Sequence, residues 1–490
     1  MPEFLSLMFD PLAWLILLPL FWANGAFLLG RARGAWLAIA GVALQLACAL
    51  LLANQLLDHG PRLHAVGGWG TPLGIALAAD GLAAVMLLLT QGVALPLLLF
   101  ARGYFADDAA AARYFWPLTG FLLAGLNALF LAADLFNLYV TLELVGLAAV
   151  GLVAAGGGVG QIAAALRYLF ATLIGSGMYL LGVALIYGVY GAVSIATLTP
   201  LIDAGAPSAV WIAGGLMLLG LMLKTALFPF HYWLPAAHGG APAPVSALLS
   251  ALVVKASFYL ILRLWLGPFA ALADSIAWLP ALLGSAAILW GSWRAIRAVR
   301  LKMLVAYSTV AQLGYLFLIF PLLRPDAAGG LLALQAGGMQ VVAHGLAKAA
   351  MFASAGVLIH VPGREAVADL TGVASRLPVT LFAFALAGVT LMGLPPSGGF
   401  LAKWLLIDAA LKQGQWWLVA VMIAGGLLAA VYVFRVLRQA FLAPSPGERR
   451  HAAHRATVLE WAAFALAAAS VLLGLRAGDL LRLLAIGSGT

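Results

Sequence analysis

Long apolar stretches, separated by short loops rich in glycine, proline and charge, run through the whole chain. Fourteen of them are long enough to cross a bilayer, which takes about 20 helical residues. Their predicted bounds are 9–29, 35–56, 80–101, 114–132, 135–156, 165–190, 208–230, 243–266, 275–293, 303–322, 329–360, 378–411, 416–441 and 457–475. Most are apolar on every face, as expected where lipid or other helices cover them. The pattern predicts an all-α polytopic membrane protein.

Composition supports this prediction. Hydrophobic residues make up 64% of the chain and charged residues 9%, and the mean hydropathy is +1.07. A soluble domain has about 25% charged residues. The chain is therefore expected to be an integral membrane protein.

Basic residues predict the orientation. Sixteen lysines and arginines adjoin the connections that follow odd-numbered segments, whereas four adjoin the other connections. By the positive-inside rule the first set is cytoplasmic, so both termini are expected on the outer (periplasmic) side of a bacterial-type inner membrane. The net charge of +9 is spread over these loops, which argues against binding of nucleic acid.

Two segments are interrupted by prolines. The first break covers 227–246 and the second covers 392–404. Proline removes a helix hydrogen bond, and in lipid the loss is tolerated only where protein or a water-filled cavity compensates it. Because the breaks fall in the seventh and twelfth segments, they predict two inverted five-helix repeats, segments 4–8 and 9–13, around a transport site. The expected divisions are 1–112, 113–266, 267–441 and 442–490.

Four lysines stand inside apolar segments and are the first candidates for function. They are Lys224, Lys255, Lys348 and Lys403. A lysine at membrane depth costs several kcal/mol unless it is paired, hydrated or neutralised. Burial favours the neutral form of lysine, which can then bind and release a proton, whereas arginine stays protonated. The four residues suggest a path for protons.

One carboxylate lies near mid-bilayer. Glu143 follows Asp134, at the start of the fifth segment, by nine residues, or about 13 Å along a helix. Glu143 is either a structural salt-bridge partner or a relay acid whose charge is set by a nearby lysine. His344 stands four residues before Lys348, on the same helix face. This histidine either passes protons between lysines or is a hydrogen-bonded neighbour of a snorkelling lysine.

Several other residues are accessory candidates. His231 and His238 flank the first break and either take part in the relay or cap loosened backbone. Asp134 and Arg167 lie near segment ends, where Arg167 could simply snorkel. His360 is expected to be structural. No metal site is expected, because the two histidines at the break are seven residues apart with no third ligand in view.

Chemistry of other kinds is not expected. Cys48 is the sole cysteine, so an internal disulfide and an iron–sulfur cluster are excluded. The sequence contains no phosphate-binding GxxxxGK[ST] loop and no dinucleotide fingerprint. We expect no cofactor and no catalytic chemistry of its own, although the chain could serve as a subunit of a proton-pumping oxidoreductase.

Six motifs resemble one known family. They are PLGIALAADGLAAVM, DLFNLYVTLE, LKTALFPFHYWLPAAHGGAPAPVSALLSALVVK, LKMLVAYSTVAQLGY, HGLAKAAMF and GLPPSGGFLAKW, spread over about residues 72–440. The chain is similar to the proton-antiporter-type membrane subunits of respiratory complex I, membrane-bound hydrogenases and Mrp-type cation/proton antiporters. Its length and motifs look most like those of the Mrp D-type subunit or a hydrogenase-associated relative.

The resemblance implies a fourteen-helix fold with two inverted repeats and assigns the buried residues. Glu143 and Lys224 become the pair of the first half-channel, and Lys255 the central lysine. His344 and Lys348 belong to the second half, and Lys403 is the terminal lysine, where some complex I members carry glutamate.

Three functions remain open. The first is a proton-translocating, possibly cation/proton-antiporting, subunit that works with other membrane subunits and with protons, Na⁺ or another monovalent cation. The second is a proton-channel subunit of an inorganic-carbon uptake complex that drives a zinc-bearing catalytic partner. The third is a structural anchor, which the cost of so many buried ionisable groups argues against.

Overall fold

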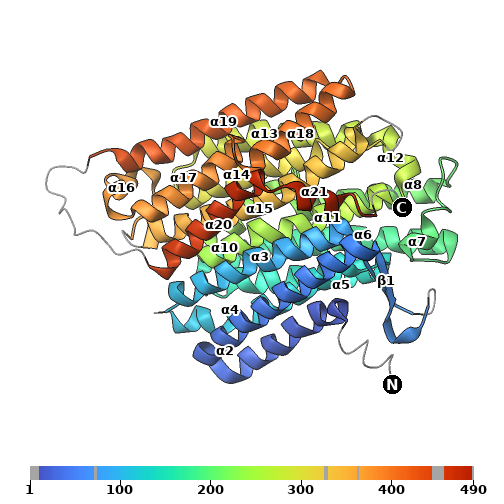
Figure 1. Cartoon of the computed structure of the whole chain (residues 1–490), viewed down its shortest axis with the longest axis horizontal. Coiled ribbons are helices and arrows are strands. Elements are labelled where there is room, and N and C mark those ends of the chain that lie inside the picture. The colour runs from blue at the N-terminus through green and yellow to red at the C-terminus, as the bar shows by residue number, and fades with distance from the viewer. Residues whose placement is uncertain are drawn as a thin grey trace.

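The computed structural model describes residues 10–70, 74–106, 108–324, 329–360, 363–443 and 457–487, and these are mostly helical (Figure 1). Most of the predicted basic loop before the last segment, residues 444–456, lies outside these ranges. The earlier helices are α2 (Pro11–His59), α3 (Gly81–Tyr104), α4 (Ala109–Leu131), α5 (Leu135–Ala154), α6 (Val159–Tyr190), α7 (Ile195–Leu198), α8 (Ser208–Thr225), α9 (Leu234–Gly240), α10 (Ala243–Leu248) and α11 (Val254–Leu266). The later helices are α12 (Ala270–Ile276), α13 (Trp278–Arg297), α14 (Leu301–Phe317), α15 (Gly330–His360), α16 (Val373–Arg376), α17 (Pro378–Met392), α18 (Gly398–Lys412), α19 (Trp416–Phe441), α20 (Val458–Leu475) and α21 (Gly478–Leu484).

Short elements connect these helices. Strands β1 (Arg62–Ala65) and β2 (Ala76–Ala79) pair antiparallel. The 3-10 turns are η1 (Val66–Gly68), η2 (Phe230–Trp233), η4 (Phe320–Leu322) and η5 (Val367–Leu370), and η3 (Leu249–Val253) is one π-helical turn between α10 and α11.

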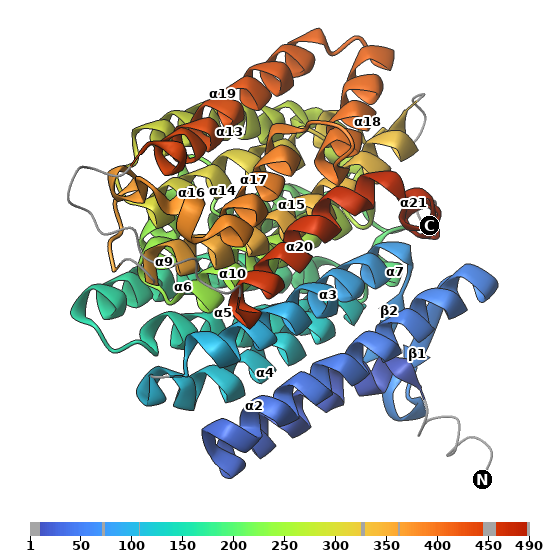
Figure 2. The same cartoon turned by 60° about the vertical axis from the view of Figure 1, so that its left-hand side comes forward.

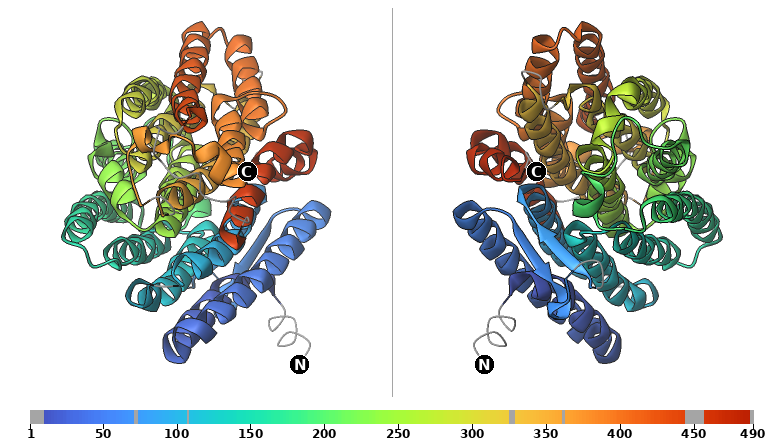
Figure 3. Two further views of the ribbon diagram at one scale, coloured as in Figure 1. Left: turned by 90° about the vertical axis from the view of Figure 1, so that its left-hand side faces the viewer. Right: turned by 90° about the vertical axis from the view of Figure 1, so that its right-hand side faces the viewer.

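The helices form one bundle, with α2 at one edge and α19 at the opposite edge (Figure 3). The most apolar stretch of residues 243–266 is buried throughout, and those of α14 and α15 are 89% buried. The charged and polar side chains of these central helices therefore face protein rather than lipid.

Helix α2 is a hairpin of two antiparallel arms. Gly30 breaks it with φ 74° and ψ −179°, a conformation that glycine adopts readily. Trp22 of the first arm donates an indole hydrogen bond to Gln45 of the second arm (2.9 Å). Figure 2 shows α2 in dark blue beside α3 and α4.

Both ends of the described chain lie at one end of the bundle. Asp10, which caps α2, lies 3.5 Å from the Arg62 guanidinium and 3.3 Å from His64 Nδ1 of β1. The Gly81 amide at the start of α3 donates to the carbonyl of Ile486 (3.1 Å).

Fewer single helices than the fourteen predicted segments are long and apolar enough to cross a membrane. Among the described residues there are eleven, or twelve if the bent pair α12–α13 counts as one span. The difference between fourteen and twelve has two causes. The first two predicted segments form the single element α2, and the twelfth is split into α17 and α18, of 15 residues each.

The two breaks lie where the prolines predicted them. Helix α8 ends before Ala226, which has a left-handed φ of 59°, and α17 ends before Gly393, with φ 79°. Each break leaves helix carbonyls without intrahelical partners. At the first break the Trp233 indole donates to the carbonyl of Leu223 (2.9 Å).

Two matching backbone bridges lie at opposite ends of the bundle. In the first, Leu135 N donates to Val193 O (2.9 Å) and Ile195 N to Ala133 O (3.1 Å), so the start of α5 pairs with the segment after α6. In the second, which joins the start of α14 to the segment after α15, the bonds run from Leu301 N to Glu365 O and from Val367 N to Val299 O, both 2.9 Å. Figure 1 places α7, which follows the first bridge, at the right and α16, which follows the second, at the left.

Candidate functional site

An ion pair joins α5 to α8 inside the bundle. Lys224 Nζ lies 3.2 Å from Glu143 Oε1, and the two side chains are 6% and 19% exposed. Asp134 accepts hydrogen bonds from the amides of Phe136 and Asn137 and so caps α5. The cap fixes where α5 begins, and thereby the height of Glu143 in the bundle.

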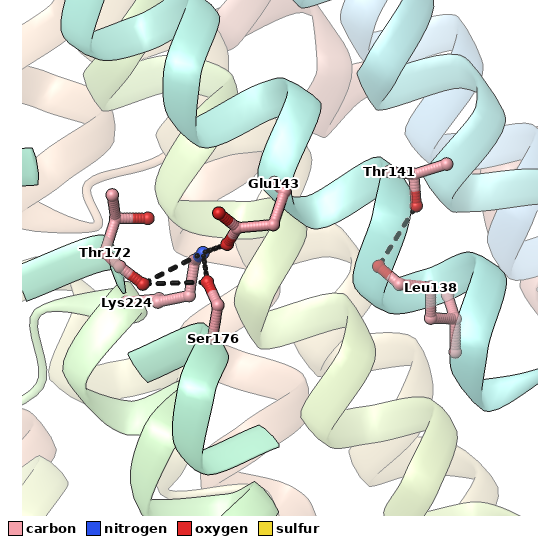
Figure 4. A network of polar contacts seen from close by, with 6 residues as sticks. All are labelled: Leu138, Thr141, Glu143, Thr172, Ser176 and Lys224. Carbon is pink, nitrogen blue, oxygen red and sulfur yellow. Dashed lines mark hydrogen bonds and ion pairs between the residues drawn. The ribbon is translucent and has the colours of Figure 1, made fainter. Parts of the chain in front are cut away.

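Helix α6 completes the surroundings of Lys224. The ammonium donates to Ser176 Oγ and, at 3.4 Å, to the carbonyl of Thr172 (Figure 4). Gly175 makes this approach possible, because a Cβ there would lie 2.8 Å from Lys224 Cγ and 2.7 Å from Gly220 O. The ammonium is thus held by one carboxylate, one hydroxyl and one carbonyl.

Hydroxyl groups lead from Lys224 toward Lys255. Thr225, the next residue on α8, donates to Ser257 Oγ of α11 at 3.0 Å. A small cavity lies beside this contact, lined among others by Lys224, Thr172 and Ser257. Most of the lining is apolar, and Lys224, Thr172 and Ser257 are among its few polar residues.

Lys255 is completely buried on α11, just after the π-helical turn η3. Its ammonium donates to the carbonyl of Ser250, five residues earlier. π-helical turns are rare and frequent at functional sites.

A second set of hydroxyls connects Lys255 with Lys348. Ser250 Oγ and Thr309 Oγ1 of α14 lie 2.9 Å apart, and Thr309 donates to the carbonyl of Val305 (3.1 Å). The same carbonyl accepts from Lys348 Nζ of α15 at 2.8 Å, and Lys348 also donates to Ser308 Oγ. The two fully buried lysines thus share a network without a carboxylate among its described members.

Two glutamines lie between Lys348 and the second break. Gln340 Nε2 donates to Gln312 Oε1 (3.4 Å), and Gln312 Nε2 donates to the carbonyl of Leu391 (3.1 Å). Lys403 Nζ binds that carbonyl at 2.7 Å. We term this set of polar groups the lysine line; its main members are Glu143, Lys224, Lys255, Lys348, Gln340, Gln312 and Lys403. It runs through both halves of the bundle.

Two histidines with unpartnered ring nitrogens lie beside the lysine line in the described part of the chain. His344, one turn before Lys348 on α15, is 1% exposed, and neither ring nitrogen has a partner within the described ranges. His238 Nδ1 is likewise unpartnered, and its ring packs edge-on against Trp233 and Phe352. The side chain of His238 therefore does not cap the loosened backbone through Nδ1.

The remaining accessory candidates lie elsewhere. Arg167 is exposed near the start of α6, and Asp134 serves as the cap of α5. His231 is partly buried and stacks on Phe228 with 5.5 Å between ring centroids. His360 ends α15, exposed, with its ring 5.6 Å from that of Tyr104. Among the described contacts, none of these side chains bonds to the lysine line.

Sequence reasoning missed the polar groups between the lysines. They are Thr172, Ser176, Ser250, Ser257, Ser308, Thr309, Gln312 and Gln340. The signal was present in LKMLVAYSTVAQLGY, where Ser308 and Gln312 are four residues apart in an otherwise apolar helix and so share one face.

Comparison with known families gives two matches. Residues 132–429 match the family described as "NADH:quinone oxidoreductase/Mrp antiporter, TM". Residues 69–115 match "NADH-Ubiquinone oxidoreductase (complex I), chain 5 N-terminus". Together they include every residue of the lysine line.

Individual relatives cover most of the chain. NADH-quinone oxidoreductase subunit N of Desulforudis audaxviator is 38% identical over 450 residues, 89% of this chain and 87% of the relative. The D-type subunit of the Na(+)/H(+) antiporter of Bacillus subtilis is 28% identical over 396 residues, 80% and 78% of the two chains. A chain in the structure of the Mrp complex from a Dietzia species superimposes with a TM-score of 0.88 at 29% identity, covering 98% of this chain and 96% of its own length.

Proposed function

Because the chain belongs to the NADH:quinone oxidoreductase/Mrp antiporter transmembrane family, we propose that it is a proton-translocating membrane subunit of a larger complex. Family membership confirms the resemblance predicted from the motifs. The observation that carries the proposal is the lysine line, in which four buried lysines alternate with hydroxyl, amide and carbonyl groups and Lys255 shares one hydrogen-bonded network with Lys348. Energy comes from a partner redox module or from an ion gradient.

Each residue has a role in this proposal. Glu143 holds Lys224 in its charged form, and loss of that contact releases the proton of Lys224 toward Lys255. Lys255 connects the halves, and His344 with Lys348 carries protons in the second half, where an unpartnered imidazole can bind water or accept a proton. Lys403 is the last lysine, at the second break.

The proposal includes fourteen membrane crossings. Three observations support this number: the two antiparallel arms of α2, the bent pair α12–α13, and the split of one predicted span into α17 and α18. The matching bridges at opposite ends support inverted repeats covering 113–266 and 267–441, with 1–112 and 442–490 outside them.

Orientation and location follow from the charge bias. Both termini face outward from a bacterial-type cytoplasmic (inner) membrane, in keeping with the proximity of Asp10 and Ile486 at one end of the bundle. The partners are other membrane subunits, together with protons and a monovalent cation such as Na⁺.

The relatives favour this function over the alternative of an inorganic-carbon uptake complex, because their names are those of quinone oxidoreductase and antiporter subunits. They do not agree on the branch. Sequence identity is higher to the quinone oxidoreductase relative than to the antiporter relative, whereas the TM-score is higher to a chain of an Mrp complex (0.88) than to a chain of respiratory complex I (0.76). The Mrp D-type or hydrogenase-associated branch therefore stays a prediction.

Proton uptake into vesicles that contain the assembled complex tests the function. Lys255→Ala should abolish coupled uptake, and Lys412→Ala is the matched control. Lys412 is half-exposed at the end of α18 and pairs with Asp408 at 2.9 Å. Uptake at the wild-type rate in a fully assembled Lys255→Ala complex would contradict the proposal.

A further inference from the structure

Lys403 differs from Lys224 in the groups that surround and stabilise its ammonium. Its ammonium donates to the carbonyls of Leu391 (2.7 Å) and Met392 (3.2 Å), the last two residues of α17. No ion pair involves Lys403 among the described residues. Gly393 brings the side chain close, because a Cβ there would lie 2.6 Å from Lys403 Cδ.

An aromatic ring covers another side of this ammonium. Lys403 Nζ lies 4.3 Å from the centroid of the Tyr315 ring, within the range of a cation–π contact. The ring belongs to α14 and is 1% exposed, so the contact is desolvated. Such contacts are strongest where water is excluded.

The orientation of Tyr315 is fixed from α19. Its hydroxyl donates to the carbonyl of Met422 at 3.0 Å, and Gly425 leaves the room for it, because a Cβ there would lie 2.3 Å from the hydroxyl oxygen. The ring cannot turn away from Lys403 without breaking this hydrogen bond.

We propose that Tyr315 is a positioning residue for proton transfer at Lys403: its ring stabilises the protonated lysine and so sets the pH range in which the second half works. The inference rests on the proposed function and deepens it. Two helix-end carbonyls and one ring face take the place of the carboxylate that Glu143 supplies in the first half.

Among the described residues, the titratable groups turned toward this part of the core are His344 and Lys348 of α15 and Tyr432 of α19. The buried carboxylate of α20, Glu460, lies at the other end of α17, where it accepts a hydrogen bond from Thr380 at 2.8 Å. Helices α17 and α20 contribute the hydroxyls of Thr390 and Ser470, which bond to each other at 2.8 Å. The π face of Tyr315 is therefore the side-chain group that favours the charged lysine here.

The competing interpretation is that Tyr315 only fills space, and variants separate the two. Tyr315→Phe keeps the ring, whereas Tyr315→Leu removes it. Phe317→Leu is the matched control, since Phe317 is fully buried on the same helix and its ring packs against Phe258 and Phe320.

The experiment measures the pH profile of ion-driven proton uptake in vesicles with the assembled complex. Loss of a cation–π contact destabilises the protonated lysine, so the half-maximum should move to lower pH in Tyr315→Leu, by about 0.4 to 1.5 pH units. Phe317→Leu should keep the wild-type midpoint. Tyr315→Phe should stay much closer to it than Tyr315→Leu, because phenylalanine keeps the ring and loses only the hydrogen bond to Met422. Equal midpoints in the Leu and Phe variants of Tyr315 would overturn the inference.

Two further arms keep the test decisive. If Tyr315→Leu does not assemble, phenylalanines with one, two or three ring fluorines at position 315 weaken the π face without changing its shape. A stepwise fall of the midpoint supports the inference, and an unchanged midpoint overturns it. Lys403→Ala tests the proposed function separately: retained uptake contradicts that function, whereas lost uptake with unshifted Tyr315 variants contradicts only the role of Tyr315.

Discussion

Lys224 and Glu143 are joined by a 3.2 Å ion pair between α8 and α5, although both helices are apolar along most of their length. At an effective dielectric near 20, two unit charges at this separation attract by roughly 5 kcal/mol. Desolvation opposes this attraction, so the net stability gained is small. Breaking the pair, however, leaves an uncompensated charge. This sensitivity favours a pair that controls release of the Lys224 proton over a pair that is only structural.

Glu143→Gln removes the charge and keeps the shape of the side chain. Loss of one partner of a buried pair costs roughly 3–5 kcal/mol, so the ratio of protonated to neutral Lys224 should fall by about a hundredfold or more. We expect coupled uptake to stop while assembly stays normal. Glu143→Asp should keep partial activity, because the charge is preserved at a longer distance.

A purely structural pair predicts the opposite pattern for Glu143→Gln. Folded protein would be lost, and whatever folded would transport normally. Measuring the amount of assembled complex and the proton uptake on the same membranes distinguishes the two roles. Normal uptake in a well-assembled Glu143→Gln variant would contradict control of proton release by the pair.

Lys403→Ala should lower coupled uptake by about a hundredfold, the scale of a positioned proton-transfer group. Its ammonium bonds to carbonyls at the end of α17, so some destabilisation is expected as well. Lys403→Glu should keep some function, because the resemblance to complex I subunits implies that glutamate can serve at this position. Wild-type uptake in Lys403→Ala, measured beside Lys412→Ala, would remove Lys403 from the path.

Two glycines on α6 give a test of packing. A Cβ at Gly175 would lie 2.8 Å from Lys224 Cγ and 2.7 Å from the backbone of α8, whereas a Cβ at Gly177 would meet nothing within 4 Å. Overpacking costs roughly 1–3 kcal/mol, so Gly175→Ala should lower both the melting temperature and the uptake rate. Gly177→Ala should leave both unchanged; equal behaviour of the two variants would show that α6 and α8 are not in close contact.

Orientation can be tested by labelling single cysteines after replacement of Cys48. Val159 at the start of α6 and Ser208 at the start of α8 are both exposed. Val159→Cys should react with an impermeant reagent only from the cytoplasmic side, and Ser208→Cys only from outside. Reversed labelling at both positions would overturn the orientation.

Single-residue signals in the sequence were enough to predict much of the site. A lysine in an apolar helix is costly wherever it lies, so Lys224, Lys255, Lys348 and Lys403 could be found without a structure. The contact of Lys224 with Glu143 was also predicted. The partners of the other lysines were not, because serine, threonine and glutamine are common in apolar helices and their roles depend on which helices pack together. The span count differed for local reasons: Gly30 turns the chain back with no loop between the two arms of α2, and the second break divides the twelfth predicted segment into α17 and α18.

The paired bridges also set a register between the two halves. Counted from the bridge residues Leu135 and Leu301, Glu143 on α5 corresponds to Thr309 on α14, each eight residues on. Counted back from Ile195 and Val367, Ser176 on α6 corresponds to Lys348 on α15, each nineteen residues before. The acid Glu143 thus corresponds to the hydroxyl of Thr309, and the hydroxyl of Ser176 corresponds to the base Lys348.

Because of these differences, the two halves carry different charges at corresponding positions. Glu143 and Lys224 together are neutral, whereas Lys348 and Lys403 gather positive charge against carbonyls and one aromatic ring. A proton is therefore held by a counter-charge in the first half, and by carbonyls, a hydroxyl and one aromatic ring in the second. In the proposed arrangement of two inverted repeats, this difference gives the two halves unequal proton affinities.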